Sequence, residues 1–242
     1  MAVIAIYSAK GGVGKTTIAA NLAWHASQEA GRNTLLWDLD AAGGAGFLYN
    51  VEPISKRGSA MFSRKQDPQE LMWETGYPNL DLLPADASMQ QLDTQLTQIG
   101  KKRQISKLTE KLGKGYDRII LDCPPGINEV SAQVVRSAEI VIVPLPPSPL
   151  SSRAFDLVAK EIKRLGKNAP SILPVFSMVD RRRKLHREAV EAQPKWPCLS
   201  YSTLTEQCAV RHQPLGAFAL SSEPAAQFSA LWKAIDRKLA RR

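Results

Sequence analysis

The chain has 242 residues, of which 44% are hydrophobic and 23% charged, a balance typical of a globular protein with a packed core. It contains no run of the ~18 consecutive apolar residues needed to cross a bilayer. Its three cysteines (Cys123, Cys198 and Cys208) are too few and too scattered for a disulfide framework or a zinc site.

Apolar segments rich in Val, Ile and Leu alternate with segments of helical periodicity. Strands are predicted at Val3–Tyr7, Thr34–Asp38, Leu80–Pro84, Arg118–Asp122, Ile140–Pro144 and Ile172–Phe176. Helices are predicted at Thr16–Glu29, Ala87–Gly113 with a break near Gly100, Val130–Ser137, Ser152–Gly166 and Arg182–Ala192. The stretch 51–76 has weak periodicity and is expected to be rich in loops. Several strands are apolar on both faces, which favours one α/β domain over residues 1–242, with a doubly wound, mostly parallel twisted sheet flanked by helices on both faces.

A glycine-rich loop follows the first predicted strand directly, so Val3–Tyr7 is expected to be a strand and not a signal peptide. Residues 9–16 satisfy the phosphate-binding pattern Gly-x-x-x-x-Gly-Lys-Ser/Thr, with Ala9 in place of the first glycine. Backbone N–H groups of such a loop surround phosphate oxygens, and the following helix adds partial positive charge. We expect ATP to be bound by Lys10, Gly11, Gly12, Val13, Gly14, Lys15, Thr16 and Thr17. Lys15 would contact the β- and γ-phosphates, and the Thr16 hydroxyl would coordinate Mg²⁺.

The second lysine of the loop, Lys10, points to a particular family. The run from Lys10 to Thr17, Lys-Gly-Gly-Val-Gly-Lys-Thr-Thr, resembles the deviant Walker A motif of the ParA/MinD family of P-loop ATPases. The resemblance covers nearly the whole chain, since the turn at 212–216 and the helix after Glu223 echo the family's final pattern. It implies that Lys10 contacts phosphates bound by a partner subunit, so that ATP closes a homodimer. Such a cation would stabilise charge on the transferring phosphoryl group; a solvated lysine is the alternative.

Two acids, Asp38 and Asp40, end the second predicted strand. Alternation along a strand would place both side chains on one side, toward the phosphate loop. By resemblance to the family, Asp40 orients or activates the attacking water and Asp38 supports the magnesium shell. The family commonly continues with Pro-Gln-Gly, whereas this chain has Ala41-Ala42-Gly43-Gly44, which predicts a more flexible loop and leaves the rate of hydrolysis open. Acids that merely cap a strand end are the alternative.

The apolar strand 118–122 ends in Asp122, which has the form of a Walker B motif. P-loop enzymes use this acid to hold magnesium through its water shell. Pro124-Pro125-Gly126 then predicts a rigid turn whose backbone could sense the γ-phosphate. Cys123 is expected to be a small buried filler and not a nucleophile, because no histidine is near it in the sequence.

The formal net charge of +9 favours association with nucleic acid or an anionic membrane surface, and the charge is clustered. Lysine and arginine on one surface would bind DNA without sequence preference and with strong salt dependence. Members of the resembled family bind DNA in this way through their carboxyl-terminal half. By region, the candidates here are Arg181, Arg182, Arg183, Lys184, Arg187 and Arg211. A solvated basic helix face is the alternative.

The last segment carries an apolar stripe at helical spacing, formed by Phe228, Leu231, Trp232, Ile235 and Leu239. A terminal amphipathic helix of this kind usually packs on the sheet, and we expect that here. The alternative is a membrane-surface helix like the one that MinD uses.

These features predict a cytoplasmic, nucleoid-associated ATPase with ATP and Mg²⁺ as cofactors. Lys10, Lys15 and Asp40 are its expected catalytic residues, and Thr16, Asp38 and Asp122 its metal-site residues. By resemblance, the ATP-bound homodimer binds nonspecific DNA and positions a cargo, and a partner protein stimulates an otherwise weak hydrolysis. A MinD-like membrane-associated regulator and a metabolic P-loop enzyme are the alternatives. The cargo itself is not encoded in any recognisable motif.

Overall fold

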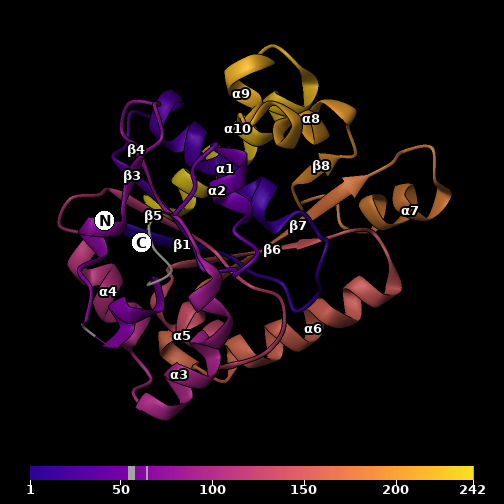
Figure 1. Ribbon diagram of the computed structural model, residues 1–242. Helices are drawn as coiled ribbons and strands as arrows, with labels where there is room; N and C mark the ends of the chain where they lie inside the picture. Colours follow the sequence, from indigo (N-terminus) through magenta and orange to yellow (C-terminus); the bar gives the residue numbers. More distant parts are fainter. Residues whose placement is uncertain (54–57, 64, 242) are drawn as a thin grey trace.

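An eight-stranded sheet forms the centre of the computed structural model, which describes residues 1–53, 58–63 and 65–241 (Figure 1). Its strand order is β3-β4-β2-β5-β1-β6-β7-β8. The strands are β1 (Ala2–Ile6), β2 (Thr34–Asp38), β3 (Trp73–Glu74), β4 (Leu80–Leu83), β5 (Arg118–Asp122), β6 (Ile140–Leu145), β7 (Ser171–Val179) and β8 (Cys198–Ser200). Neighbouring strands pair in parallel, except for the edge strand β3, which runs antiparallel to β4.

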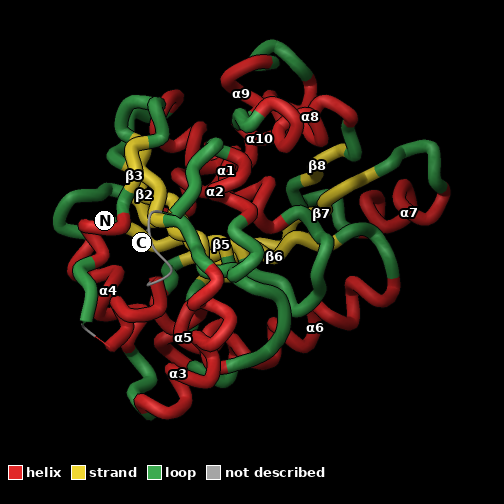
Figure 2. Tube along the Cα trace, in the orientation of Figure 1, coloured by secondary structure: helices red, strands yellow, loops and turns green. Residues whose placement is uncertain are grey.

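Helices cover both faces of this sheet (Figure 2). One face carries α1 (Lys15–Trp24), α2 (Gly44–Leu48), α8 (Thr203–Arg211), α9 (Leu215–Phe218) and α10 (Glu223–Leu239). The other carries α3 (Leu92–Ile99), α4 (Gln104–Leu112), α5 (Glu129–Ser137) and α6 (Pro149–Lys163), while α7 (Lys184–Ala192) lies beside the end of β7. Alternate residues of a strand enter different cores: Ile4 and Ile6 pack with α1 and α10, whereas Val3 and Ala5 pack on the opposite face. The predicted doubly wound, mostly parallel sheet is confirmed.

Most predicted elements are present, with shifts at their ends. The expected break at Gly100 is real, because this residue ends α3 with a φ of 64°, a left-handed conformation that glycine adopts at little cost. The helix predicted from Arg182 begins only at Lys184, because the Arg183 N–H donates to the Asp180 carbonyl and forms a turn first. Strand β7 continues beyond its predicted end, to Val179.

Several short elements escaped the sequence patterns. These are α2, β3, β8, α8 and α9, of which most span five residues or fewer. Within the stretch expected to be loop-rich, residues 54–57 and 64 lie outside the described residues. The remainder forms two 3₁₀ helices, η2 (Gly58–Ser63) and η3 (Pro68–Leu71), together with β3.

The terminal helix α10 packs against the sheet as expected. Phe228, Leu231, Trp232 and Ile235 are all at most 3% exposed and belong to the same core as α1. Asp236 of this helix forms an ion pair with Arg118 at the start of β5, with the two charged atoms 2.7 Å apart. Across the described residues, no helix combines the length and apolar character needed to cross a membrane.

The segment before α10 is fixed to α1 by one buried amide. Asn21, fully buried, accepts the backbone N–H of Leu215 at 2.7 Å and donates to the Thr17 carbonyl at 2.8 Å. Gly216 then packs so closely on Trp24 that a Cβ at this position would lie 2.1 Å from the indole ring. This contact holds the carboxyl-terminal segment on the helix that follows the phosphate loop.

Substituting Gly216→Ala should therefore lower the free energy of unfolding by roughly 1–3 kcal/mol, the usual cost of overpacking a core. Denaturant unfolding followed by tryptophan fluorescence would measure the loss. Gly115→Ala is the matched control, because the nearest atom to its new Cβ is 3.9 Å away. Equal stability of the two variants would show that the Trp24 contact relaxes without cost.

Candidate functional site

The strand order brings the three predicted motifs together. Strand β5 lies between β1 and β2, and all three run parallel, so the loops that follow them leave the same edge of the sheet. Asp122, the last residue of β5, is in register with Ile6 of β1 and with Asp38 of β2. The loop after β1 is the glycine-rich loop. The phosphate loop, the Asp38–Asp40 segment and Asp122 therefore form one site.

The phosphate loop is held open by two glycines in left-handed conformations. Gly12 has a φ of 68° and Gly14 a φ of 86°, and a Cβ at Gly12 would find no atom within 4 Å. Helix α1 begins at Lys15 with no side chain capping its amino end and no acid in its first turn. Its first N–H groups and its partial positive charge are therefore available to an anion.

The two lysines of the loop lie in different environments. Lys15 is only 7% exposed, and within the described residues no carboxylate forms an ion pair with it. A nearly buried ammonium without a bound anion is costly, and a phosphate would offset that cost. Lys10 is exposed, and its backbone N–H donates to the Ser8 hydroxyl at 3.2 Å. The side chain of Lys10 is therefore free to reach a group outside its own loop.

Asp122 is a buried carboxylate without hydrogen-bond donors. It is 0% exposed, and neither of its oxygens has a partner among the described residues. Burial raises the pKa of Asp122 above its usual range, while the nearby Thr16 and Lys15 side chains oppose this rise. Such an unsatisfied acid fits a hydrated cation, because water molecules bound to Mg²⁺ are donors.

The remaining ligands of a magnesium ion would come from the nucleotide and from water. No group of three or more His, Cys, Asp or Glu side chains able to hold a metal occurs in the described part of the chain. Mg²⁺ commonly uses one or two protein ligands together with phosphate oxygens and water. Thr16 and Asp122 fit that pattern.

Asp38, by contrast, already has donors. Its two oxygens accept the backbone N–H groups of Asp40 at 3.0 Å and Ala45 at 2.9 Å, and the residue is fully buried. Burial, followed by the charge of Asp122, raises the pKa of Asp38 well above its usual range. Asp38 thus joins the end of β2 to the start of α2 and fixes the loop between them.

Asp40 shapes that loop directly. Its carboxylate accepts the N–H of Ala42 at 3.1 Å, and its carbonyl accepts the N–H of Gly43 at 2.9 Å, which makes a closed turn. Gly44 then lies against Thr16, because a Cβ there would be 3.0 Å from the threonine methyl. The Ala41-Ala42 segment is therefore held at both ends in this structure, and the greater flexibility of its loop stays a prediction.

The turn after β5 is tied to the end of β1. The Tyr7 hydroxyl donates to the Gly126 carbonyl at 2.9 Å, and Gly126 has a φ of 97°. Burial raises the pKa of Tyr7, so the phenol stays protonated and remains a donor. Cys123, also as expected, is fully buried, and burial raises the pKa of its thiol well above the usual range, which makes it a poor nucleophile.

A cavity of about 130 Å³ opens beside the phosphate loop, and the sequence patterns did not reveal it. Its lining includes Gly14 and Thr17 from the loop and Met178 and Tyr201 from the ends of β7 and β8. Two lining hydroxyls, Ser177 Oγ and Thr205 Oγ1, are buried with no hydrogen-bond partner among the described residues. Met178 has a φ of 54°, unusual for a residue with a side chain, and such strain is often found at binding sites.

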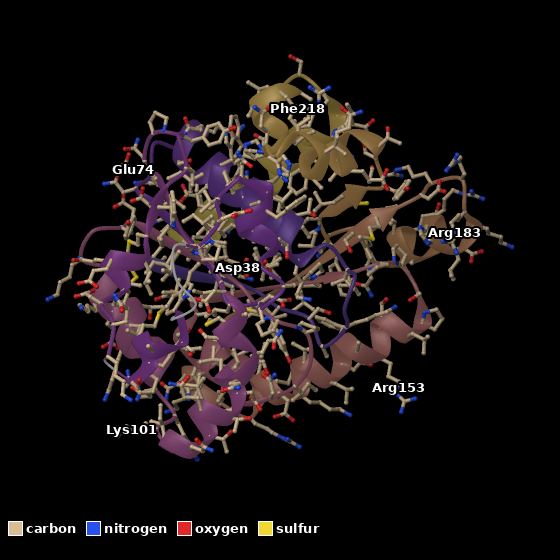
Figure 3. The ribbon with its side chains drawn as sticks, viewed as in Figure 1. Asp38, Glu74, Lys101, Arg153, Arg183 and Phe218 are labelled. Carbon is tan, nitrogen blue, oxygen red and sulfur yellow. The ribbon has the colours of Figure 1, made fainter. Side chains whose placement is uncertain are left out.

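The predicted basic residues divide into two groups; Figure 3 labels Arg183 of the first and Phe218, the ring over which Arg211 of the second stacks. Arg181 and Arg182 lie in the turn after β7, followed by Arg183, Lys184 and Arg187 at the amino end of α7, and all five are exposed. Arg211 is separate, because it ends α8 and stacks over Phe218 of α9 at 4.9 Å.

The arginines of the first group differ in whether other protein groups already bind their side chains. Arg182 forms a double hydrogen bond with Asp180, both at 2.9 Å, and Arg187 donates to the carbonyls of Arg181 and Arg182. Arg181 and Arg183 have no ion-pair partner among the described residues. Helix α7 has neither a side-chain cap nor an acid in its first turn, so the local field is strongly positive.

The loop that carries these cations is held by a neutral histidine. The backbone N–H of Asp180 donates to Nδ1 of His186 at 3.0 Å, and that nitrogen can accept only while it is unprotonated. Burial and the nearby charge of Arg183 lower the pKa of His186, which favours this state. His186 is thus a helix residue with a structural role.

The buried acids predict a dependence of stability on pH in protein stripped of nucleotide and divalent cations. Because the folded pKa of Asp122 is raised, the folded state binds more protons than the unfolded state, and stability falls as pH rises through that folded pKa. Asp122→Asn should therefore raise the free energy of unfolding at neutral pH, with the gain vanishing near pH ~4, where the parent carboxyl is protonated in both states.

Denaturant titrations over a pH series would measure this difference. With saturating ATP and magnesium the order should reverse, because the variant loses the stabilisation that the ligand gives to the folded state. Parallel pH profiles for the two proteins would contradict the inferred burial cost.

Comparison with known proteins supports this arrangement. A family model described as an AAA domain matches residues 1–175. The chain is 28% identical over 207 residues to the cell division protein PomZ of Myxococcus xanthus, which covers 82% of this chain and 65% of PomZ. It is 33% identical over 146 residues to the chromosome partitioning protein ParA of the same organism, covering 59% of this chain and 51% of that protein. The chain thus matches less than two thirds of the length of either relative.

A solved structure of Cyanothece McdA in complex with ATP superimposes with a TM-score of 0.83, covering 98% of this chain and 96% of McdA. At 20% identity this likeness shows the shared fold. The family match over residues 1–175, together with the phosphate loop and its two buried acids, gives the assignment. The chain belongs to the AAA-domain family, in the ParA/MinD group of P-loop ATPases.

Proposed function

We propose that this chain is a ParA-like ATPase that uses ATP binding and hydrolysis to switch between a free state and a DNA-bound dimer. The observation that carries the nucleotide part is Asp122, a buried acid whose oxygens have no hydrogen-bond partner among the described residues, beside a phosphate loop that leads into a helix without a side-chain cap. Relatives in this group include cell division and chromosome partitioning proteins, which supports a role in positioning or segregating a cargo.

In this proposal the backbone of residues 11–17 and the Lys15 ammonium bind the phosphates of ATP. Thr16 and Asp122 hold the magnesium, which would neutralise phosphate charge when bound, and Asp38 keeps the adjoining loop in place. The cavity beside Gly14 receives the base, because its apolar walls suit a purine face and its two unpartnered hydroxyls suit the polar edge of the ring.

Hydrolysis requires a water molecule aligned with the γ-phosphate, and we assign its orientation to Asp40. In this structure the Asp40 carboxylate caps its own turn through Ala42, so one of its oxygens is occupied. Slow intrinsic hydrolysis is the expected result, with stimulation by a partner protein that rearranges the turn. The Gly126 carbonyl, held by Tyr7, fixes the neighbouring turn on the other side of the site.

Dimerisation would complete the site. Lys10 is exposed at the mouth of its own loop and forms no ion pair within the described residues, which fits a cation that acts on nucleotide bound by a second copy. Each bound triphosphate would attract Lys10 of the other subunit. Dimerisation would therefore depend on bound ATP.

DNA would bind at the exposed cations of the β7–α7 turn. Arg181 and Arg183 are the most available, because Arg182 and Arg187 already have protein partners. The positive end of α7 adds to their field, and duplex phosphates would neutralise both. A nucleoid-associated location in the cytoplasm follows from this activity. A MinD-like membrane attachment through α10 is not favoured, because the apolar stripe of that helix is buried.

The two loop lysines should separate binding from dimerisation. Lys15→Ala removes a charge-assisted contact to the phosphates and should weaken ATP binding by about tenfold to a hundredfold. Lys10→Ala should leave ATP binding nearly unchanged and abolish ATP-dependent dimerisation and hydrolysis. Fluorescent nucleotide titration and sedimentation velocity would measure the two properties, with exposed Lys167→Ala as the control. ATP-dependent dimers and normal turnover in the Lys10 variant would refute the role in trans.

The basic turn should govern DNA affinity through charge. Replacing Arg181 and Arg183 together by alanine should weaken duplex binding and lower the slope of log K against log salt by roughly 2, one for each lost phosphate contact. Fluorescence anisotropy of ATP-loaded protein at several salt concentrations would measure this slope. The control pair, Lys163→Ala with Lys167→Ala, removes the same charge from exposed positions on α6 and η5 (Gly166–Asn168). An unchanged slope in the arginine variant would place DNA binding elsewhere.

A further inference from the structure

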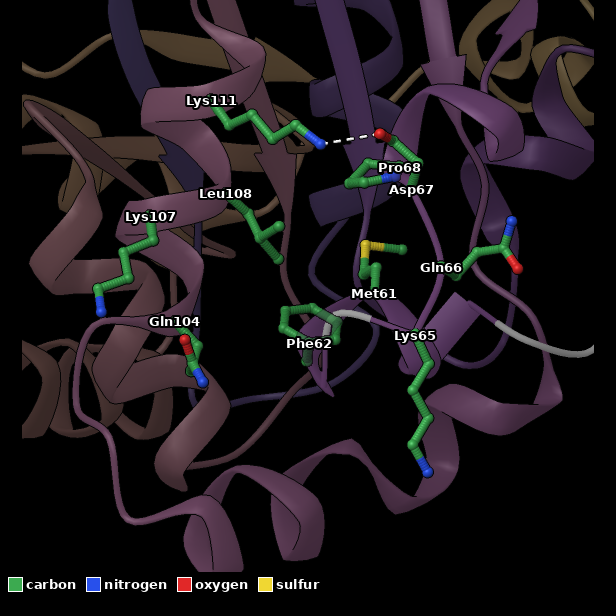
Figure 4. Close-up of a pocket in the computed structure, with 10 residues that line it drawn as sticks. All are labelled: Met61, Phe62, Lys65, Gln66, Asp67, Pro68, Gln104, Lys107, Leu108 and Lys111. Atoms are coloured by element: carbon green, nitrogen blue, oxygen red, sulfur yellow. Dashed lines mark hydrogen bonds and ion pairs between the residues drawn. The ribbon is translucent and has the colours of Figure 1, made fainter.

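A second cavity, of about 420 Å³, lies between the η2–η3 segment and α4 (Figure 4). None of its lining residues belongs to the phosphate loop, to the cavity beside Gly14 or to the β7–α7 turn. Its lining consists of Met61, Phe62, Lys65, Gln66, Asp67, Pro68, Gln104, Lys107, Leu108 and Lys111. The volume is within the range of ligand-binding pockets, ~300–1,000 Å³.

One face of α4 forms a wall of this cavity. Gln104, Lys107, Leu108 and Lys111 follow the i, i+3, i+4, i+7 spacing that aligns side chains along a helix. On the adjoining face of α4, Ile105 and Leu112 are buried in the core, and Leu108 packs partly against the same core. Lys107 and Lys111, four residues apart, lie on the same side of the helix, and Lys111 is paired with Asp67 at 2.9 Å.

The floor of the cavity is apolar. Met61 and Phe62 are each 2% exposed, and the Phe62 ring stacks on Trp37 of the core with centroids 6.0 Å apart. Leu108 adds a half-buried aliphatic surface from α4. This floor is fixed by the core, so the cavity is preformed and requires little ordering to receive an apolar group.

The charge around the cavity is unbalanced. Asp67 is the single acid in the lining, and it is already engaged by Lys111 at 2.9 Å. Lys65 and Lys107 have no ion-pair partner among the described residues. Figure 4 shows the Lys111–Asp67 pair at one end of the cavity and Lys65, Gln104 and Lys107 toward the other. Near α4 in the sequence, Lys101, Lys102 and Lys114 are exposed, and the exposed Arg103 is paired with Glu110 at 3.2 Å.

We propose that this cavity is a docking site for an acidic protein segment that carries one apolar anchor residue. The anchor would fill the space over Met61, Phe62 and Leu108, while its flanking carboxylates would pair with Lys65 and Lys107. The apolar residues of the lining distinguish this occupant from duplex DNA, whose phosphate surface offers no apolar group to bury. The site is separate from the proposed nucleotide and DNA sites, so a partner bound here would leave both accessible.

A fluorescein-labelled peptide of Asp and Glu residues around a central Phe is the probe, and its binding to the full chain would be followed by fluorescence anisotropy. The double variant Lys65→Glu with Lys107→Glu should weaken binding by about tenfold or more, because two attractive pairs become repulsive. The matched control, Lys102→Glu with Lys114→Glu, makes the same change in net charge outside the lining and should weaken it by less than about threefold. Replacing the central Phe of the peptide by Ser should also weaken binding by about tenfold.

Three outcomes would overturn the proposal. Equal weakening by the two double variants would show a diffuse charge effect, and equal affinity of the Phe and Ser peptides would show that the floor is not used. Loss of duplex DNA binding in the Lys65/Lys107 variant, to the same degree as loss of peptide binding, would assign the surface to DNA. Thermal melts and ATP titrations of every variant establish that the fold and the nucleotide site are intact, so a failure here is distinct from a failure of the proposed ATPase function.

Discussion

The structure is organised around two carboxylates that lie side by side inside the sheet. Asp38 and Asp122 end adjacent parallel strands in register, and both are fully buried. Two like charges at such a place are unfavourable: burial raises the pKa of both acids, and the charge of Asp122 raises that of Asp38 further. Asp38 is stabilised by two backbone N–H groups, but the Asp122 oxygens have no hydrogen-bond partner among the described residues. The pair of acids therefore favours a bound cation. The phosphate loop beside it, with its lysines and uncapped helix, favours a bound anion.

Much of this site could be predicted from the sequence because its chemistry is local. The glycines, Lys15 and Thr16 follow one another in a strand–loop–helix unit whose geometry is nearly independent of the rest of the chain. Asp38 and Asp122 were identifiable as acids at the ends of apolar strands, and a parallel sheet brings strand ends together. Their pairing in register, and the difference between an anchored Asp38 and an unsatisfied Asp122, depended on the strand order and on the fold of residues 40–45.

What escaped prediction depends on contacts between distant segments. The cavity beside Gly14 combines the phosphate loop with β7, β8 and α8, and the last two elements are short and have no strong periodicity. The need for glycine at position 216 could not be predicted either. It arises from contact with the Trp24 ring, which lies nearly two hundred positions earlier in the chain. The start of α7 shifted because Asp180 formed a turn with the following arginines, a local competition that the apolar pattern does not register.

The end of β7 has a consequence for how the molecule could report its nucleotide state. Met178 lines the cavity beside the phosphate loop, and Asp180, two residues later, starts the turn that presents Arg181 and Arg183. His186 of α7 accepts a hydrogen bond from the backbone N–H of Asp180 in this turn. The backbone from 177 to 183 therefore connects the cavity directly to the turn that carries the exposed arginines. A change in backbone conformation at Met178 on filling of the cavity would reach Arg181 and Arg183 within a few residues, without passing through the core or crossing the sheet.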